Sequence, residues 1–461
     1  MPLKLFNTLG RLKEEFKPIK FPAAGIYACG PTVYNYQHIG NYRTYIFEDI
    51  LKRTLGFLGF KPFHVMNITD VGHLTSQGDE GEDKVEVMAR REGKSAWDLA
   101  KFYTDAFLKD CSSLNILPPD VLCRATDNIQ EQIDLIRRLE KNGFLYSTSD
   151  GVYFETAKFP DYDKLMGKAH LSGIQFGARV EASPEKKSPS DFAVWKFSPK
   201  NQKRQMEWDS PWGTGFPGWH IECSAMAMKY LGETFDIHCG GVDHIPIHHS
   251  NEIAQSEGAT GKPFVRYWLH GEFLLVNSSK MAKSDGTFIT LEDLRQKGFD
   301  PLDYRYHCLT AHYRKQLDFT WEALESSKTA RRKLGDLIGQ IRGALKKPAC
   351  ADSLNAFKEA LSDDLNMPEA LSVLWSDLKN GALPEGARLH FAETAEGVLG
   401  LGLLEDKAEE SLSPEIIELI DSRALARKNR DFRRSDEIRV KLFSLGIIVE
   451  DTPSGQKWRR A

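Results

Sequence analysis

Residue types that bind metals are concentrated in one stretch of the chain. Five of the 13 histidines fall between positions 220 and 249: His220, His238, His244, His248 and His249. Cys223 lies in the same stretch, and Glu252 follows it. Zinc accepts thiolate, imidazole and carboxylate ligands at four positions. On a helix that begins near Pro246, His248 and Glu252 would project from the same face. Together with Cys29, from an earlier strand end, these residues form a candidate set of zinc ligands, and partly buried structural histidines are the alternative.

Two other motifs carry groups suited to phosphate. His38-Ile39-Gly40-Asn41 opens a predicted helix, whose N-terminus offers unpaired amide groups and the positive end of a dipole. The side chains of His38 and Asn41 would both donate to phosphate oxygens. Far downstream, Lys280 and Lys283 lie three residues apart in KMAKSDG, a predicted loop whose charges could follow a pyrophosphate. Taken singly, the first motif is short enough to occur by chance, and the second is typical of a solvated basic turn.

A strand, a helix and a second strand position the first motif. Residues 25–34 are apolar and β-prone, with Gly-Pro in the middle, and residues 62–72 form a second such run. Between them, apolar residues recur on one helical face: Ile46, Phe47, Ile50, Leu51 and Leu55. This βαβ unit predicts a Rossmann-type parallel sheet. Such sheets bind ligands outside the carboxyl ends of their strands, where the segment from Cys29 to Gly40 would lie.

The rest of the chain predicts an α/β fold with an insertion, a helical bundle and a small terminal domain. We expect the first half of the catalytic domain at 1–115, an insertion at 116–215, and the second half, with the zinc site, at 216–270. The KMAKS loop region follows at 271–315, the bundle at 316–404 and the terminal domain at 405–461. The bundle is predicted from a one-sided apolar stripe: Leu334, Leu337, Ile338, Ile341 and Leu345.

Composition excludes several classes of protein. The 461 residues are 41% hydrophobic and 27% charged, and no apolar run approaches the ~20 residues that span a bilayer. The seven cysteines are scattered and no secretion signal is evident, which predicts reduced thiols and a cytoplasmic protein without a membrane partner. Net charge is -4, but residues 421–461 carry eleven Lys/Arg against six acids. This basic end favours a polyanion contact there, with a solvated helix face as the alternative.

HIGN followed far downstream by KMAKS resembles the paired signature of class I aminoacyl-tRNA synthetases. The flanking segments YACGPTVYNYQHIGNYRT, NITDVG, GWHIECSAM, GGVDHIPIHHSNEIAQSE and KMAKSDG resemble the cysteinyl-tRNA synthetase family in order and spacing over essentially the whole chain. Asn41 replaces the second histidine of HIGH, and Ala282 replaces the middle serine of KMSKS. We expect these departures to change the tuning of the site rather than to abolish activity.

The resemblance implies roles for particular residues. The family's zinc ligands fall on Cys29, Cys223, His248 and Glu252, with one ion per chain. His38 and Asn41 would contact ATP, and Lys280 and Lys283 would hold its phosphates together with Mg2+. Asp243 would bind the adenosine ribose, with a turn-capping role as the rival interpretation. Cys29, Thr69 and Trp219 would line the cysteine pocket, although Trp219 is also suited to a core position.

The implied reaction joins L-cysteine to tRNA(Cys) through a cysteinyl-adenylate, with zinc recognising the substrate thiolate. A shape-reading pocket separates cysteine from serine by only ~1–3 kcal/mol, whereas a soft thiolate binds Zn2+ far better than a hydroxyl does. The region 271–315 would contact the tRNA stem, and the terminal domain would read the anticodon side. Its predicted tRNA contacts are Arg427, Arg430, Phe432, Arg433, Arg434, Asp436 and Asp451.

Two other functions fit part of the sequence. A related cysteine ligase would use the same adenylating core on a small amine, but such an acceptor needs neither the bundle nor the basic tail. A non-catalytic zinc protein that binds RNA would not need His38 and the paired lysines. Nothing in the sequence demands more than a monomer.

Overall fold

The computed structural model describes residues 1–75, 81–167, 185–199, 204–277, 279–280, 288–405, 414–452 and 455–460. The chain separates into two compact units, residues 1–404 and 405–461, and each is described by itself. Among the described residues, no helix is both long enough and apolar enough to cross a membrane.

A five-stranded parallel sheet forms the centre of the larger unit and confirms the predicted Rossmann-type fold. Its strands are β3 (Ala23–Ala28), β4 (Lys61–Ile68), β5 (Val121–Arg124), β10 (Phe235–Gly241) and β11 (Val265–Gly271), in the order β11-β10-β3-β4-β5. The chain moves outward from β3 through β4 to β5, and it later returns to the other side of β3 as β10. The carboxyl ends of β3 and β10 therefore flank a topological switch point, where open α/β sheets bind ligands.

The insertion is an antiparallel sheet, and it begins later than expected. Its strands are β6 (Leu145–Ser147), β7 (Gly151–Phe154), β8 (Phe192–Phe197) and β9 (Gly215–Pro217), paired in that order. Because β5 pairs with β4 in the parallel sheet, the first half of that sheet extends beyond residue 115, the limit predicted from the sequence. The four residues of β5, of which only Cys123 is buried, give too short an apolar signal to be recognised as a sheet strand.

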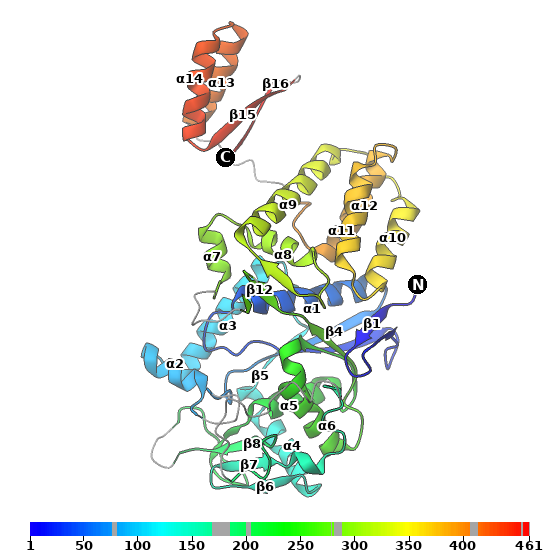
Figure 1. Ribbon diagram of the computed structural model, residues 1–461, viewed down its shortest axis with the longest axis vertical. Helices are drawn as coiled ribbons and strands as arrows, with labels where there is room; N and C mark the ends of the chain where they lie inside the picture. The colour runs from blue at the N-terminus through cyan, green and yellow to red at the C-terminus, as the bar shows by residue number, and fades with distance from the viewer. Residues whose placement is uncertain are drawn as a thin grey trace. The chain divides into compact units, whose positions relative to one another are not determined.

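Helices on both sides of the sheet complete the catalytic core. They are α1 (Ile39–Phe57), α2 (Lys84–Glu92), α3 (Ala96–Ser113), α4 (Ile129–Lys141), α5 (Trp219–Leu231) and α6 (Ser250–Thr260). All five apolar residues predicted to share one face of α1 are buried. Figure 1 shows α1 passing between the sheet and the later helices, while α5 and α6 lie beside the insertion. The helix that opens at His38 therefore contacts both the sheet and the C-terminal part of this unit.

A small sheet connects the core to the bundle. It consists of β12 (Leu274–Val276), β13 (Ser279–Lys280) and β14 (Leu317–Phe319), and two short helices, α7 (Leu291–Gln296) and α8 (Pro301–Leu309), lie between β13 and β14. The bundle follows as α9 (Trp321–Ile341), α10 (Ala351–Ser362), α11 (Met367–Lys379) and α12 (Glu385–Leu399). Leu334, Ile338 and Ile341 are buried as predicted, but Leu345 lies beyond the end of α9 and is 86% exposed. The prediction for Leu345 was wrong because the helical period continues in the sequence after the helix has ended.

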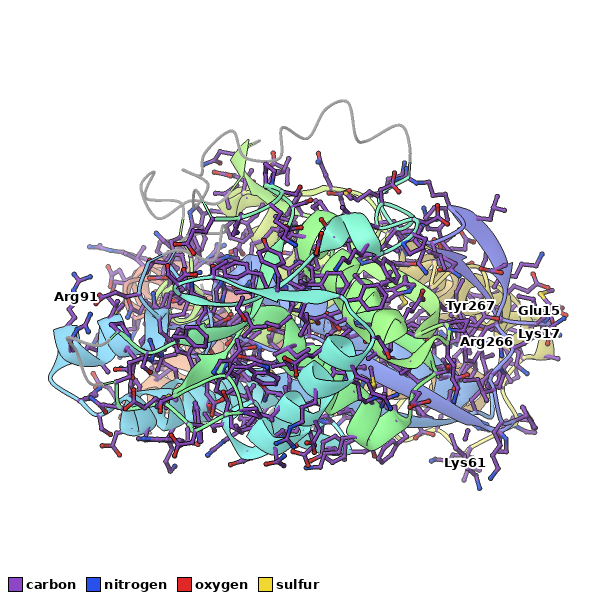
Figure 2. The ribbon with its side chains drawn as sticks, turned by 90° about the horizontal axis from the view of Figure 1, so that it is seen from below. Glu15, Lys17, Lys61, Arg91, Arg266 and Tyr267 are labelled. Atoms are coloured by element: carbon purple, nitrogen blue, oxygen red, sulfur yellow. The ribbon has the colours of Figure 1, made fainter. Side chains whose placement is uncertain are left out.

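An N-terminal hairpin, β1 (Lys4–Asn7) and β2 (Leu12–Glu15), packs against the β11 edge of the parallel sheet. The Tyr267 hydroxyl accepts from the Lys17 amide at 2.9 Å and donates to the Glu15 carbonyl at 3.0 Å. Figure 2 shows these residues with Arg266 and Lys61 at one end of the molecule and Arg91 at the other. The hairpin thus covers a sheet edge that would otherwise expose unpaired backbone N–H and C=O groups.

The smaller unit contains α13 (Pro414–Lys428), α14 (Phe432–Ser444), β15 (Ile447–Thr452) and β16 (Gly455–Arg460). Its core includes Ile420, Leu442, Ile447 and Val449. The buried Arg423 donates to both carboxylate oxygens of Asp451 at 3.0 Å. The carboxylate of Asp451, predicted to accept from base edges, also pairs with Arg427, so in this structure arginines engage it. Phe432 is 57% exposed, as a residue that stacks on a base must be.

Candidate active site

An open pocket lies at the switch point of the parallel sheet. Its walls come from the segment after β3, the end of β4, the start of α5 and the turn after β10. The pocket includes most of the predicted site residues: Cys29, His38, Asn41, Thr69, Trp219, Cys223, Asp243 and His248. These residues, which are far apart in the sequence, are thus brought together at one edge of the sheet, as the topology rule for parallel sheets predicts.

The four predicted zinc ligands form a compact buried cluster. One ligand atom from each of Cys29, Cys223, His248 and Glu252 lies within 4.8 Å of the others, and all four residues are buried. His248 Nε2 is 3.0 Å from Glu252 Oε1, and Cys29 Sγ is 3.9 Å from the same oxygen. Four elements supply them: the end of β3, the helix α5, the π-helical turn Ile245–His249 and the helix α6. Two sulfurs, one imidazole and one carboxylate are a donor set that zinc accepts.

Charge within this cluster also suits a cation. Burial raises the pKa of the Cys223 thiol, but the hydrogen bond from Cys29 and the charge on His248 lower it to about 6. Burial likewise opposes ionisation of Glu252, but His238 and His248 hold its pKa below the ordinary value. A thiolate and a carboxylate buried side by side favour a divalent cation between them.

A second set of four ligand atoms shares two members with the first. Cys29 and Glu252 also lie within 4.8 Å of His238 and His249. His238 Nε2 is 2.9 Å from Glu252 Oε2, and His249 Nε2 is 3.4 Å from Cys29 Sγ. The sequence indicated the first set, from the spacing of His248 and Glu252, but gave no sign that His238 and His249 form a second one. The first set contains two thiols and the second only one, so zinc, which binds thiolates strongly, favours the first.

Trp219 and Thr69 lie on the wall next to this cluster. Trp219 is half-buried and stacks between His248, at 4.7 Å, and His73, at 4.1 Å between ring centroids. Burial lowers the pKa of His73, so its ring is neutral. Its Nε2 accepts from the Lys84 ammonium at 2.7 Å, and its Nδ1 bonds to the Thr32 hydroxyl at 2.7 Å. His73 and Lys84 are absent from the predicted site, and their only signal in the sequence is the position of His73 directly after NITDVG.

His38 and Asn41 form the N-terminal cap of α1. The Asn41 amide donates to His38 Nδ1 at 3.1 Å, and the His38 amide donates to Asn41 Oδ1 at 3.1 Å. Because Nδ1 accepts, the neutral His38 ring carries its proton on Nε2. Because Oδ1 of Asn41 accepts this hydrogen bond, its Nδ2 group still carries two protons that can donate. Both side chains can therefore present N–H groups to an anion while they also cap the helix.

The nucleotide end of the pocket is only partly described. Lys280 is the last residue of β13, but its side chain and all of Lys283 and Ala282 lie outside the described residues. Asp243 is exposed at the pocket rim, in the turn after β10. A Cβ on Gly241 would lie 2.4 Å from Asp243 Oδ1, so a side chain there would displace the Asp243 carboxylate.

One residue of α1 holds the segments on both sides of the KMAKS region, and sequence reasoning missed it. The Arg43 guanidinium donates to the Glu272 carbonyl at 2.8 Å and also to the Phe273 and Lys315 carbonyls. These carbonyls precede β12 and β14. On the far side of the loop, the Ile39 amide donates to the Ile289 carbonyl at 2.8 Å. The helix that carries His38 and Asn41 therefore fixes both flanks of the lysine-bearing loop.

The parallel sheet, the capped helix at its switch point and the downstream lysine segment define a class I aminoacyl-tRNA synthetase. The family model described as "tRNA synthetases class I (C) catalytic domain" matches residues 15–329, and "Cysteinyl-tRNA ligase anticodon binding domain" matches residues 409–459. The chain belongs to the cysteine–tRNA ligase family.

Relatives named cysteine–tRNA ligase match this chain over its length. The protein from Burkholderia lata is 51% identical over 99% of this chain and 97% of its own length. The protein from Treponema denticola is 46% identical over the whole of both chains. Among solved structures, a methionyl-tRNA synthetase from Mycobacterium tuberculosis in complex with methionyl-adenylate has a TM-score of 0.56 and 16% identity, covering 82% of this chain and 90% of that one. That likeness concerns the fold alone.

Proposed function

We propose that this protein activates L-cysteine with ATP and transfers the cysteinyl group to the terminal adenosine of tRNA(Cys). The single observation that carries the substrate assignment is the buried cluster of Cys29, Cys223, His248 and Glu252 at the floor of the pocket. The family and the names of the relatives support the same substrate.

The residues of the cluster fit a zinc ion in their chemistry and spacing. Zn2+ held there would offer a ligand position to a thiolate, which a serine hydroxyl matches poorly because its pKa is far higher. His220 Nδ1 lies 2.9 Å from His248 Nδ1, so one ring donates to the other and His248 turns Nε2 toward the cluster. His238 holds the second oxygen of Glu252. Such outer partners orient metal ligands and fix their tautomers.

The nucleotide end would bind ATP with Mg2+. The Nε2–H of His38 and the amide protons of Asn41 donate to phosphate oxygens at the N-terminus of α1, and Lys280 and Lys283 neutralise the leaving pyrophosphate. Asp243 at the rim accepts from the ribose hydroxyls. This chemistry needs mainly positioning and charge stabilisation, which these residues supply.

Both steps then balance without a further reactant. A carboxylate oxygen of cysteine forms a bond to the α-phosphorus of ATP, and the bond to pyrophosphate breaks. The ribose hydroxyl of the terminal adenosine next attacks the carbonyl carbon, loses its proton and releases AMP. The Thr69 and Trp219 wall orients the amino acid for the first step. The smaller unit, with its exposed Phe432 and its arginines, contacts the anticodon side of the tRNA.

An aminoacylation assay tests this function. The purified protein is incubated with ATP, Mg2+, labelled cysteine and unfractionated tRNA, and acid-precipitable label is measured. We expect charging with cysteine and none with labelled serine. Pyrophosphate exchange that depends on cysteine, without charging, would contradict the tRNA acceptor and favour a small amine. Absence of both reactions would contradict the whole proposal.

A further inference from the structure

Two exposed aromatic side chains meet at the rim of the pocket. Tyr36, in the loop before His38, is 48% exposed, and Phe102, on α3, is 44% exposed. Their ring centroids lie 6.2 Å apart in an edge contact, and both rings contact Tyr103 at 5.2 and 5.1 Å. Single exposed apolar residues need no explanation, but a contiguous group beside an open pocket is typical of a binding surface. We call Tyr36 and Phe102 the aromatic rim.

Neighbouring residues hold the aromatic rim in place. Tyr103 is 7% exposed, and its hydroxyl donates to Glu92 at 2.8 Å, which ties α3 to the end of α2. Gly93 then takes a left-handed conformation with φ of 65° and turns the chain between the two helices. Lys94, directly after this turn, places its ammonium 4.4 Å from the centre of the Phe102 ring. The rings are therefore presented to solvent from a fixed support rather than from loose side chains.

The aromatic rim continues the wall of the active-site pocket. Tyr36 lines that pocket together with its neighbours Gln37 and His38. Its loop is tied internally, because the Tyr36 amide donates to Asn35 Oδ1 at 2.9 Å and Gln37 Nε2 donates to the Thr32 carbonyl at 3.3 Å. Phe102 does not line the pocket itself, but it contacts Tyr36, which does.

We propose that the aromatic rim stacks the unpaired bases that precede the terminal adenosine of the tRNA. This inference rests on the proposed function, in which that adenosine must reach the pocket. Unpaired bases at RNA ends are recognised by stacking on aromatic side chains, since every base has a π face. Lys94, which also pairs with Glu92 at 2.9 Å, and the exposed Arg91 at the end of α2 are the cations that this turn offers to backbone phosphates. Figure 2 shows Arg91 at the end of the molecule away from Lys61.

The test replaces Phe102 and follows the base directly. A tRNA substrate carries 2-aminopurine in place of the nucleotide before the terminal adenosine. Binding to the unchanged protein should quench its fluorescence. In Phe102→Ala the quenching should be lost, and KM for tRNA in charging should rise about tenfold, the size expected for one stacked base. Phe102→Leu keeps an apolar side chain against Tyr103 without a π face and should behave like alanine, whereas Phe102→Trp should retain quenching.

Controls separate stacking from a general loss of structure. Phe21 is 74% exposed, on the segment before β3, and Phe21→Ala should leave quenching and charging unchanged. A tRNA that lacks its unpaired 3′ nucleotides should bind the unchanged protein about tenfold more weakly, and Phe102→Ala should no longer distinguish the two tRNAs. Full quenching and an unchanged KM in Phe102→Ala would overturn the inference. A failure of the unchanged protein to charge tRNA, by contrast, would contradict the proposed function.

Discussion

The two ends of the active-site pocket are built in opposite ways. At the cysteine end, Cys29, Cys223, His248 and Glu252 are all buried, and each is at most 6% exposed. At the end predicted to bind ATP, His38 and Asn41 are half-exposed, Asp243 is exposed, and Lys280 is the last residue of the short edge strand β13. Both ends lie at the same edge of one sheet, so the difference does not come from the fold alone.

In the proposed function, the difference follows from the task of each end. Cysteine and serine differ by one atom, so discrimination needs ligands held in a fixed geometry before the substrate arrives. Burial and the surrounding histidines provide that rigidity. A triphosphate carries enough charge to be recognised by donors at a helix N-terminus, and its pyrophosphate must leave. An open end suits that task, provided that the HIGN and KMAKS motifs are held in a fixed relative position.

The largest expected effect concerns the buried end. Cys223→Ser removes one of two sulfurs, and we expect zinc content to fall from about one ion per chain to near zero. Preference for cysteine over serine should then fall to about 10- to 200-fold, the level that a shape-reading pocket provides. Metal analysis and pyrophosphate exchange with each amino acid measure the two effects.

A matched control for this variant is Cys239→Ala. Cys239 is also fully buried, on β10, but it belongs to neither set of four ligand atoms. We expect it to keep zinc and selectivity, apart from a loss of stability. Selectivity that survives in Cys223→Ser without bound zinc would contradict the proposed role of the buried end.

The next effect concerns Arg43, which connects the helix that follows HIGN to the segments that flank KMAKS. Arg43→Met removes the donors to the carbonyls of Glu272, Phe273 and Lys315. Small misplacements of catalytic groups cost up to about 100-fold in rate, so kcat of cysteine-dependent pyrophosphate exchange should fall by about 10- to 100-fold. Zinc content and KM for cysteine should change little.

Arg53→Met is the control on the same helix. Arg53 donates to the carbonyls of Asn115 and Gly397 and pairs with Asp49, all away from the lysine segment. Both variants should lose stability, but kcat should fall much further in Arg43→Met than in Arg53→Met. Equal losses of kcat in the two variants would mean that Arg43 acts only through stability.

A smaller effect is expected at the helix cap. Asn41→Ala removes the acceptor for the His38 amide, a contact worth about 1 kcal/mol in other N-terminal caps. Since Asn41 also donates to phosphate in the proposed function, we expect kcat/KM for ATP to fall by at least about fivefold. Asn41→His, which restores the class signature, should stay within about tenfold of the unchanged protein. Saturation kinetics for ATP at fixed cysteine distinguish the two variants.

The smallest expected effect on activity concerns Glu396, which lies away from both ends of the pocket. Glu396, on α12, accepts from the Gly402 amide at 2.6 Å, but its Oε2 has no hydrogen-bond partner among the described residues. Burial raises the pKa of Glu396 to about 7. Because the unfolded chain ionises this group at lower pH, the folded state loses stability as the pH rises from about 5 to 8.

Glu396→Gln should therefore gain stability relative to the unchanged protein by about 2 kcal/mol over that pH interval. Denaturant unfolding at pH 5 and pH 8 measures the gain. Pyrophosphate exchange should be unaffected at either pH. A difference in stability that does not depend on pH would show that Glu396 is ionised throughout.

Much of the site was predictable because its residues stand in local patterns. The spacing of His248 and Glu252 placed both on one helix face, and the position of His38 after a strand predicted a helix N-terminus. Arg43, His73, Lys84 and Phe102 carry no such signal. Arg43 bonds to Lys315 and Phe102 contacts Tyr36, and no local pattern reports a contact between segments so far apart in the chain.

The sequence by itself determined the residue types, the order of the strands along the chain and the helix face that α1 buries, because periodicity and cap residues act over a few positions. Only the tertiary structure decided that Cys29 and Cys223 meet, since β3 and α5 come together through sheet pairing. It also decided that β5 joins the parallel sheet and that Asp451 pairs with Arg423. Pairing between distant segments depends on the energy of the whole packed core, which no short stretch of sequence contains.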